Sequence, residues 1–168
     1  DTVIVAGVLP QLVQDLEVSV GSAAAVVTLF SLTYAIGAPV LASLTVGLPR
    51  PTMLIGAMAC FTLANVLSML SPTLPWLLAS RVVAALAAAA YSPVATAAAA
   101  ALSPAHLRGR AVAIVIGGLA VAILLGVPVG TWIGTHFGWR AAFLFVAFLG
   151  AASTLLLSAT RWALPTPP

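Results

Sequence analysis

Two ionisable side chains within apolar stretches are the residues of this sequence best suited to chemistry. Asp1 opens the segment DTVIVAGVLP, and Arg81 lies in the long apolar segment that follows Pro75. An acid within a membrane is costly unless it faces a cavity or a partner, and such residues mark ion and proton pathways. Asp1 is therefore a candidate proton-coupling site, or else a solvated chain end. The Arg81 guanidinium either snorkels to the nearby surface or pairs with a charge inside a helix bundle.

The sequence does not contain the residue groups that most other chemistry requires. Its three acids fall within the first 17 residues, and its two histidines fall in expected turns on opposite sides, so no serine–histidine pair, aspartate pair or HExxH motif forms. There is no GxxxxGK[ST] phosphate loop, and Cys60 is the only cysteine. The arginines are scattered, whereas nucleic acid requires a basic patch. We therefore expect a carrier driven by an ion gradient, with no catalytic site, metal or cofactor.

The composition indicates a membrane protein. Hydrophobic residues make up 62% of the sequence and charged residues 5%, whereas ordinary soluble domains are roughly 25% charged. We expect an all-α, polytopic membrane helix bundle over residues 1–161, with residues 162–168 beginning a proline-rich cytoplasmic linker. The six expected transmembrane spans are residues 1–12 (the outer part of a truncated first helix), 23–44, 53–70, 76–102, 111–135 and 141–159.

Several polar and aromatic residues have expected structural roles. Ser22 is placed to cap the helix that follows it. Asn65 is an isolated amide, for which we favour an interhelical hydrogen bond over a substrate contact. Trp76 and Trp139 each stand near the start of a span, at the level where the membrane meets water.

Small residues recur every fourth position in the fifth span. They are Gly118, Ala122, Gly126, Gly130 and Gly134. This spacing gives a slowly curling groove on one side of a helix, where another helix can approach closely. Pro128 removes a backbone donor and predicts a kink. Glycine and proline are also simply commoner in membrane helices, so the pattern indicates either a tightly packed, bent helix or ordinary membrane composition.

The charges predict an orientation. Because consecutive spans alternate sides, four arginines share one face and Arg140 lies with Asp15 and Glu17 on the other. The first group comprises Arg50, Arg108, Arg110 and Arg161. The positive-inside rule places that group in the cytoplasm. We therefore expect a multi-pass protein of the inner (plasma) membrane with a cytoplasmic N-terminus.

Several motifs together resemble a known family. GVPVG at residues 126–130, with Gly118 and Gly134 around it, is similar to an antiporter motif of a fifth helix, and LLASRVVAALAAAA at residues 77–90 is similar to a fourth-helix motif with an inward arginine. DTVIVAGVLPQL, TLFSLTYAIGAPVLASL and GWRAAF also match in order and spacing. The chain resembles the N-terminal half of a major facilitator superfamily transporter, closest to the bacterial drug:proton antiporter, or arabinose-efflux-permease-like, group.

The resemblance implies two six-helix halves that rock around a midplane cavity, each half with a nested inverted repeat. It implies that Asp1 takes the acidic position of the first helix, that Arg81 regulates it, and that Gly126, Pro128 and Gly130 seal and bend an interface. It also implies as partners the lipid bilayer, protons, a small-molecule substrate and a missing C-terminal half.

One position departs from the family pattern. Val46 stands where the family has an acid in the loop between the second and third helices, so charge pairing at that loop is in doubt. Tyr34 and Tyr91 are candidate cavity aromatics, with lipid or core packing as the other interpretation. A sugar or metabolite transporter on the same fold remains an alternative, and so does a non-transporting membrane scaffold or inactive fragment.

Overall fold

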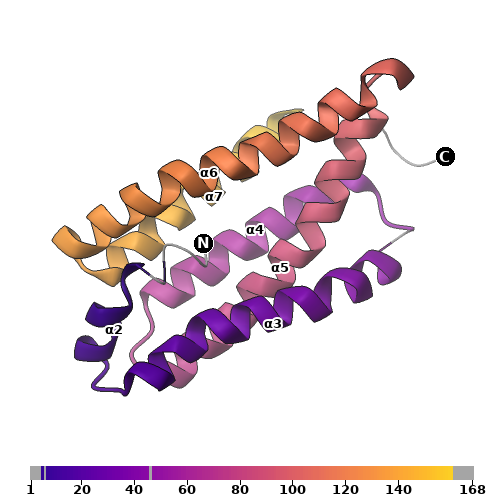
Figure 1. Cartoon of the computed structure of the whole chain (residues 1–168). Coiled ribbons are helices and arrows are strands. Elements are labelled where there is room, and N and C mark those ends of the chain that lie inside the picture. Colours follow the sequence, from indigo (N-terminus) through magenta and orange to yellow (C-terminus); the bar gives the residue numbers. More distant parts are fainter. Residues whose placement is uncertain (1–4, 6, 46, 161–168) are drawn as a thin grey trace.

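The structure consists of helices joined by short turns. The computed structural model describes residue 5, residues 7–45 and residues 47–160. The described part contains no strand, which confirms the all-α class (Figure 1). Its helices are α2 (Leu9–Asp15), α3 (Val20–Leu44), α4 (Arg50–Met69), α5 (Leu74–Ala101), the short 3₁₀ helix η1 (Ala105–Leu107), α6 (Arg108–Phe137) and α7 (Trp139–Thr160).

Among the described residues, five helical segments are long and apolar enough to cross a membrane: α3, α4, α5, α6 with η1, and α7. Each begins slightly before the expected span. A proline in the first turn of α4 and of α5 explains part of this difference, since proline lacks only a donor that would be unpaired there anyway. Ser19 caps α3 by accepting from the Ser22 N–H at 3.1 Å, so the expectation of Ser22 as the cap is wrong. His136 belongs to the last turn of α6 and not to a turn between helices.

Helices α4 and α5 form the centre of the bundle. Helix α5 packs against both α3 and α4, α4 packs also against α7, and α6 lies beside α7 and α5 (Figure 1). Small side chains make this approach possible. The buried alanines of α5 include Ala84 and Ala85, against which Phe30 of α3 and Ala64 of α4 pack.

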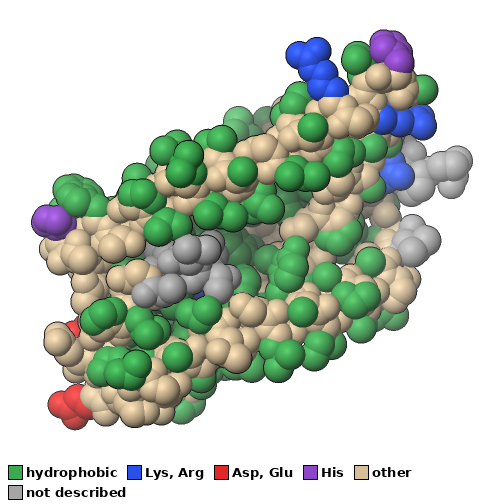
Figure 2. Space-filling view, viewed as in Figure 1, with side chains coloured by type: hydrophobic (Ala, Val, Ile, Leu, Met, Phe, Trp, Pro, Cys, Tyr) green, Lys and Arg blue, Asp and Glu red, His purple; other side chains and the backbone are tan. Residues whose placement is uncertain are grey.

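Apart from the buried Arg81, the charged groups described lie at the two ends of the bundle. Figure 2 shows arginine side chains gathered at one end and acidic side chains at the other, with hydrophobic side chains over the length between them. The first end carries Arg50, Arg108 and Arg110, and the second carries Asp15 and Glu17. This separation fits helices that cross a lipid layer, since the charges stay near water.

The small-residue groove of α6 packs against other described residues over only part of its length. Gly130 and Gly134 are buried, Gly126 is half-buried, and Gly118 and Ala122 are exposed. A Cβ atom at Gly134 would collide with the Val8 side chain, whereas one at Gly118 would meet open space. Helix α6 continues without a break through Pro128.

This contrast gives a matched pair of substitutions. Gly134→Ala should lower the free energy of unfolding of the full-length protein by about 1–3 kcal/mol, because Val8 is fully buried and its branched side chain has little freedom to move. Gly118→Ala on the same helix should leave stability unchanged or slightly raised. Thermal unfolding of both variants in detergent tests this expectation. Equal melting temperatures for the two would contradict it.

Candidate functional site

Arg81 is held inside the helix bundle, although it is charged. Arg81 exposes 1% of its surface, and its guanidinium reaches from α5 to residues of α4 and α7. The Nε group donates to Ser68 Oγ at 3.1 Å, and Nη2 donates to Ser68 Oγ at 2.5 Å and to Asn65 Oδ1 at 3.1 Å. The guanidinium also lies over the Phe143 ring, 4.6 Å from its centroid. The guanidinium therefore does not snorkel to the surface.

The partners of Arg81 are themselves held in place. Asn65 Nδ2 donates to the Phe61 carbonyl at 2.8 Å, which turns the amide oxygen toward the guanidinium. Ser68 Oγ donates to the Ala64 carbonyl at 2.8 Å and lies 2.7 Å from Ser80 Oγ. Fixed acceptors cost little further entropy when they bind a cation, so the site is organised in advance. The interhelical hydrogen bond expected for Asn65 is confirmed.

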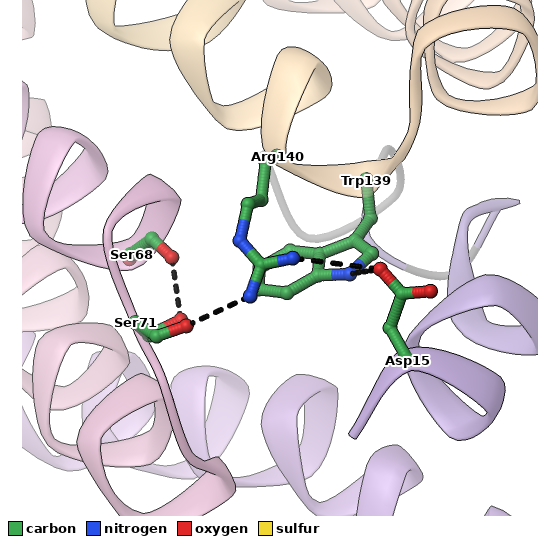
Figure 3. A network of polar contacts seen from close by, with 5 residues as sticks. All are labelled: Asp15, Ser68, Ser71, Trp139 and Arg140. Atoms are coloured by element: carbon green, nitrogen blue, oxygen red, sulfur yellow. Dashed lines mark hydrogen bonds and ion pairs between the residues drawn. The ribbon is translucent and has the colours of Figure 1, made fainter. Parts of the chain in front are cut away.

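A second polar network ties together three parts of the chain at the acidic end of the bundle. We call Asp15, Ser71, Trp139 and Arg140 the end clasp (Figure 3). Asp15 Oδ2 accepts from Trp139 Nε1 at 3.0 Å and from Arg140 Nη1 at 3.4 Å. Arg140 Nη2 donates to the Ser71 carbonyl at 3.2 Å. One arginine thus links the end of α2, the turn between α4 and α5, and the start of α7.

The tight corner between α6 and α7 places this network. Gly138 is the single residue between the two helices and has a φ of 84°, a region that favours glycine. It turns the chain so that Trp139 enters the core with 1% of its surface exposed. The expectation that Trp139 belongs to an aromatic belt is therefore wrong, because its ring packs in the core and its indole N–H donates to the half-exposed Asp15 carboxylate. Trp76 is 51% exposed, as a belt residue would be.

Two adjoining hollows lie midway along the long helices. The larger, of about 440 Å³, is lined by Phe30, Ser31, Tyr34, Phe61, Ala88, Ser92 and Leu119. The smaller, of about 120 Å³, shares Phe61, Ala88 and Ser92 with it and is lined also by Ala57, Met58 and Tyr91. Tyr34 and Tyr91, predicted from sequence as cavity candidates, therefore both line a hollow.

The remaining predicted residues lie elsewhere. Asp1, the proton-coupling candidate, and Val46 lie outside the described residues. Arg50 begins α4 and lines a hollow of about 220 Å³ with Thr45, Met53 and others at the arginine-rich end. Arg108 and Arg110 are exposed at the start of α6.

Comparison with known families matches residues 1–168, the whole chain, to the Major Facilitator Superfamily. The chain belongs to this superfamily. Membership points to a transporter rather than an enzyme, and the spanning helices and bacterial relatives point to a multi-pass protein of the inner membrane.

Relatives within the superfamily are bacterial membrane proteins. The chloramphenicol resistance protein of Streptomyces lividans is 42% identical over 142 residues, which cover 84% of this chain and 36% of that protein. The uncharacterized MFS-type transporter YtbD of Bacillus subtilis is 37% identical over 144 residues, 86% of this chain and 36% of that protein. The inner membrane transport protein YdhP of Escherichia coli is 36% identical over 151 residues, 90% of this chain and 39% of that protein. The chain thus spans well under half the length of these superfamily members.

Sequence reasoning located Arg81 in this superfamily chain but missed most of its surroundings. Ser68, Phe143 and Ser71 are serine and apolar residues of types that recur throughout the sequence, and no local signal marks them. Their role follows from the register of α4 and α7 against α5, which only the packed structure gives. The Asp15–Arg140 pair had a partial signal, since both were predicted to lie on the same face of the membrane.

The Arg81 site predicts a specific loss of stability. Ser68→Ala should lower the free energy of unfolding by about 1–3 kcal/mol, because it removes an acceptor from a buried charged donor. Ser153→Ala on α7 is the matched control, since that exposed hydroxyl bonds the Leu149 carbonyl of its own helix. Thermal unfolding in detergent is the measurement. A Ser68→Ala variant as stable as the Ser153→Ala variant would show that the guanidinium is held by other contacts.

Proposed function

We propose that the chain forms the N-terminal six-helix half of a secondary transporter that exports small, drug-like or metabolite molecules in exchange for protons. The observation that carries this proposal is the burial of the charged Arg81 side chain among membrane-spanning helices, where the other buried polar residues described are the uncharged Asn65 and three serines. A charge inside membrane-spanning helices is costly and usually serves transport. Alternating access, in which two halves rock around a central site, is the mechanism that goes with this fold.

The proton-coupling role falls to Asp1. It occupies the acidic position of the first-helix motif by resemblance, and Arg81 occupies the inward arginine position of the fourth-helix motif. A guanidinium near a carboxyl favours its charged form, so displacement of the arginine would let the acid take up a proton. In this scheme Arg81 regulates the acid and does not itself release a proton.

The paired hollows beside Tyr34 and Tyr91 suit an apolar or amphipathic molecule. Their described lining combines aromatic rings with the hydroxyls of Ser31, Ser92 and the two tyrosines. Binding sites for small molecules are mostly apolar with a few placed polar groups. The name of the Streptomyces relative adds support for an exported antibiotic-like compound.

The exposed part of α6 suits contact with a further set of helices. Gly118 and Ala122 stand on it, and Gly126 and Pro128 follow toward the buried part. Small residues allow close helix contact in lipid, and the relatives are much longer than the matched stretch. We assign this face to the C-terminal six-helix half, with the arginine-rich end and the N-terminus in the cytoplasm.

Substrate-evoked proton flux in vesicles tests the function. Full-length protein should move protons when chloramphenicol is added, and Asp1→Asn should reduce that flux at least tenfold because an amide cannot take up a proton. Glu17→Gln is the control, since Glu17 is an exposed acid at the end of the bundle and its loss should leave the flux intact.

Three outcomes would count against the proposal. Undiminished flux in the Asp1→Asn variant would remove Asp1 as the coupling site. No flux with chloramphenicol, sugars or other metabolites, from a well-inserted protein, would favour a non-transporting membrane scaffold. Flux with sugars or metabolites alone would move the protein to the alternative transporter class on the same fold.

A further inference from the structure

Two continuous lines of contact connect the end clasp to Arg81. The first runs through aromatic rings on α7. Trp139 and Phe143 meet edge to face, with centroids 5.8 Å apart and planes at 89°. The Phe143 ring also contacts Arg81, whose guanidinium carbon lies 4.6 Å from the ring centroid. Because Trp139 and Phe143 are four residues apart, they lie on one face of the helix.

The second line runs through hydrogen bonds on α4. Arg140 Nη2 donates to the Ser71 carbonyl at 3.2 Å, and Ser71 Oγ donates to the Ser68 carbonyl at 2.6 Å. Ser68 Oγ in turn accepts from Arg81. The end clasp therefore fixes the last turn of α4, from which the acceptor of the guanidinium projects.

Burial of the side chains increases along both lines of contact, from the end clasp to Arg81. The side chains of Asp15 and Arg140 are 53% and 45% exposed, whereas Trp139, Phe143, Ser71 and Ser68 are fully or almost fully buried. Arg140 also lies over the Trp139 ring, 4.3 Å from its centroid. The contacts thus extend from the water-exposed end of the bundle to the buried cation.

We propose that Trp139 is a positioning residue for Arg81. Asp15 and Arg140 fix the indole from two sides, the indole fixes Phe143, and Phe143 fixes the plane of the guanidinium. Ser71 bonds the backbone of Ser68 and so holds the Ser68 hydroxyl where it accepts from the guanidinium. The consequence for transport rests on the proposed function, because Arg81 is there assigned control of the proton site.

The groups around Arg81 decide how a shift in the pH dependence of proton flux is interpreted. Among the described residues, Arg81 bonds Asn65 and Ser68 of α4 and lies over Phe143 of α7, and Ser80 of its own helix lies within hydrogen-bond distance of Ser68. The acids among the described residues are Asp15 and Glu17, and Asp15 pairs with Arg140. The assigned proton site, Asp1, lies outside the described residues.

A double-mutant cycle in the full-length protein tests the proposal. Chloramphenicol-evoked proton flux is measured against pH for Trp139→Leu, Arg81→Lys and the double variant. Trp139→Leu should move the midpoint of the pH profile by about half a pH unit or more, in the same direction as Arg81→Lys. The double variant should move it no further than Arg81→Lys alone, because coupled residues give non-additive effects.

Trp132→Leu is the matched control. Trp132 lies at the same end of the bundle on α6, is largely exposed, and contacts the rings of His136 and Phe137. Its loss should leave the pH midpoint in place. A Trp139→Leu variant with lower flux but an unmoved midpoint, or shifts that add in the double variant, would overturn the positioning role.

Melting temperatures of the same variants in detergent test the positioning role of Trp139 separately from the proposed transport function. If the parent protein gives no flux, the proposed function loses its support, and the cycle on melting temperature decides the positioning role. Non-additive losses for Trp139→Leu and Arg81→Lys support it, and additive losses overturn it. If Trp139→Leu does not accumulate, Ser71→Ala interrupts the second line and takes its place in both cycles.

Discussion

The cost of holding a guanidinium inside an apolar bundle is the constraint on which the rest of this structure depends. Insertion of an arginine at the centre of a membrane helix costs on the order of 2.5–3.5 kcal/mol on translocon scales, and each buried N–H requires an acceptor. The chain meets this cost with a serine hydroxyl, an asparagine oxygen and an aromatic face, from α4 and α7. Replacement of a whole buried polar cluster by well-packed apolar residues is often neutral or stabilising. We therefore attribute the charge of Arg81 to the proposed transport function and not to stability.

The two ends of the bundle are built differently. At the acidic end, the end clasp joins the end of α2, the turn between α4 and α5 and the start of α7, and a cluster of apolar residues that includes Trp139 and Phe143 packs beside it. At the arginine-rich end, Arg108 and Arg110 are exposed, and most of α6 presents apolar side chains outward. The acidic end therefore has more internal contacts than the arginine-rich end. In the alternating access that we propose, the halves rock as units, and these contacts would hold the acidic end together during that movement.

The sequence was sufficient for the class and for most element positions, because long apolar segments separated by proline and polar turns leave few alternatives in lipid. Arg81 could be singled out because a charge in such a segment is rare. Its partners could not, since Ser68 and Phe143 resemble many other residues until helix register places them. Tryptophan is common at the membrane surface, which predicts that position for Trp139, but its ring is buried in the core and its indole N–H bonds Asp15. The small residues of α6 form a visible pattern in the sequence, but within the described bundle only Gly130 and Gly134 of that pattern are buried.

The most direct test of this account compares transport with stability after Arg81→Met in the full-length protein, with Arg108→Met at the exposed end as control. We predict that the Arg81 variant inserts and melts within a few degrees of the parent protein but loses at least tenfold of its substrate-evoked proton flux, while the control keeps both. Full flux from the Arg81→Met variant would contradict the account, because the buried charge would then be only a structural feature of the bundle.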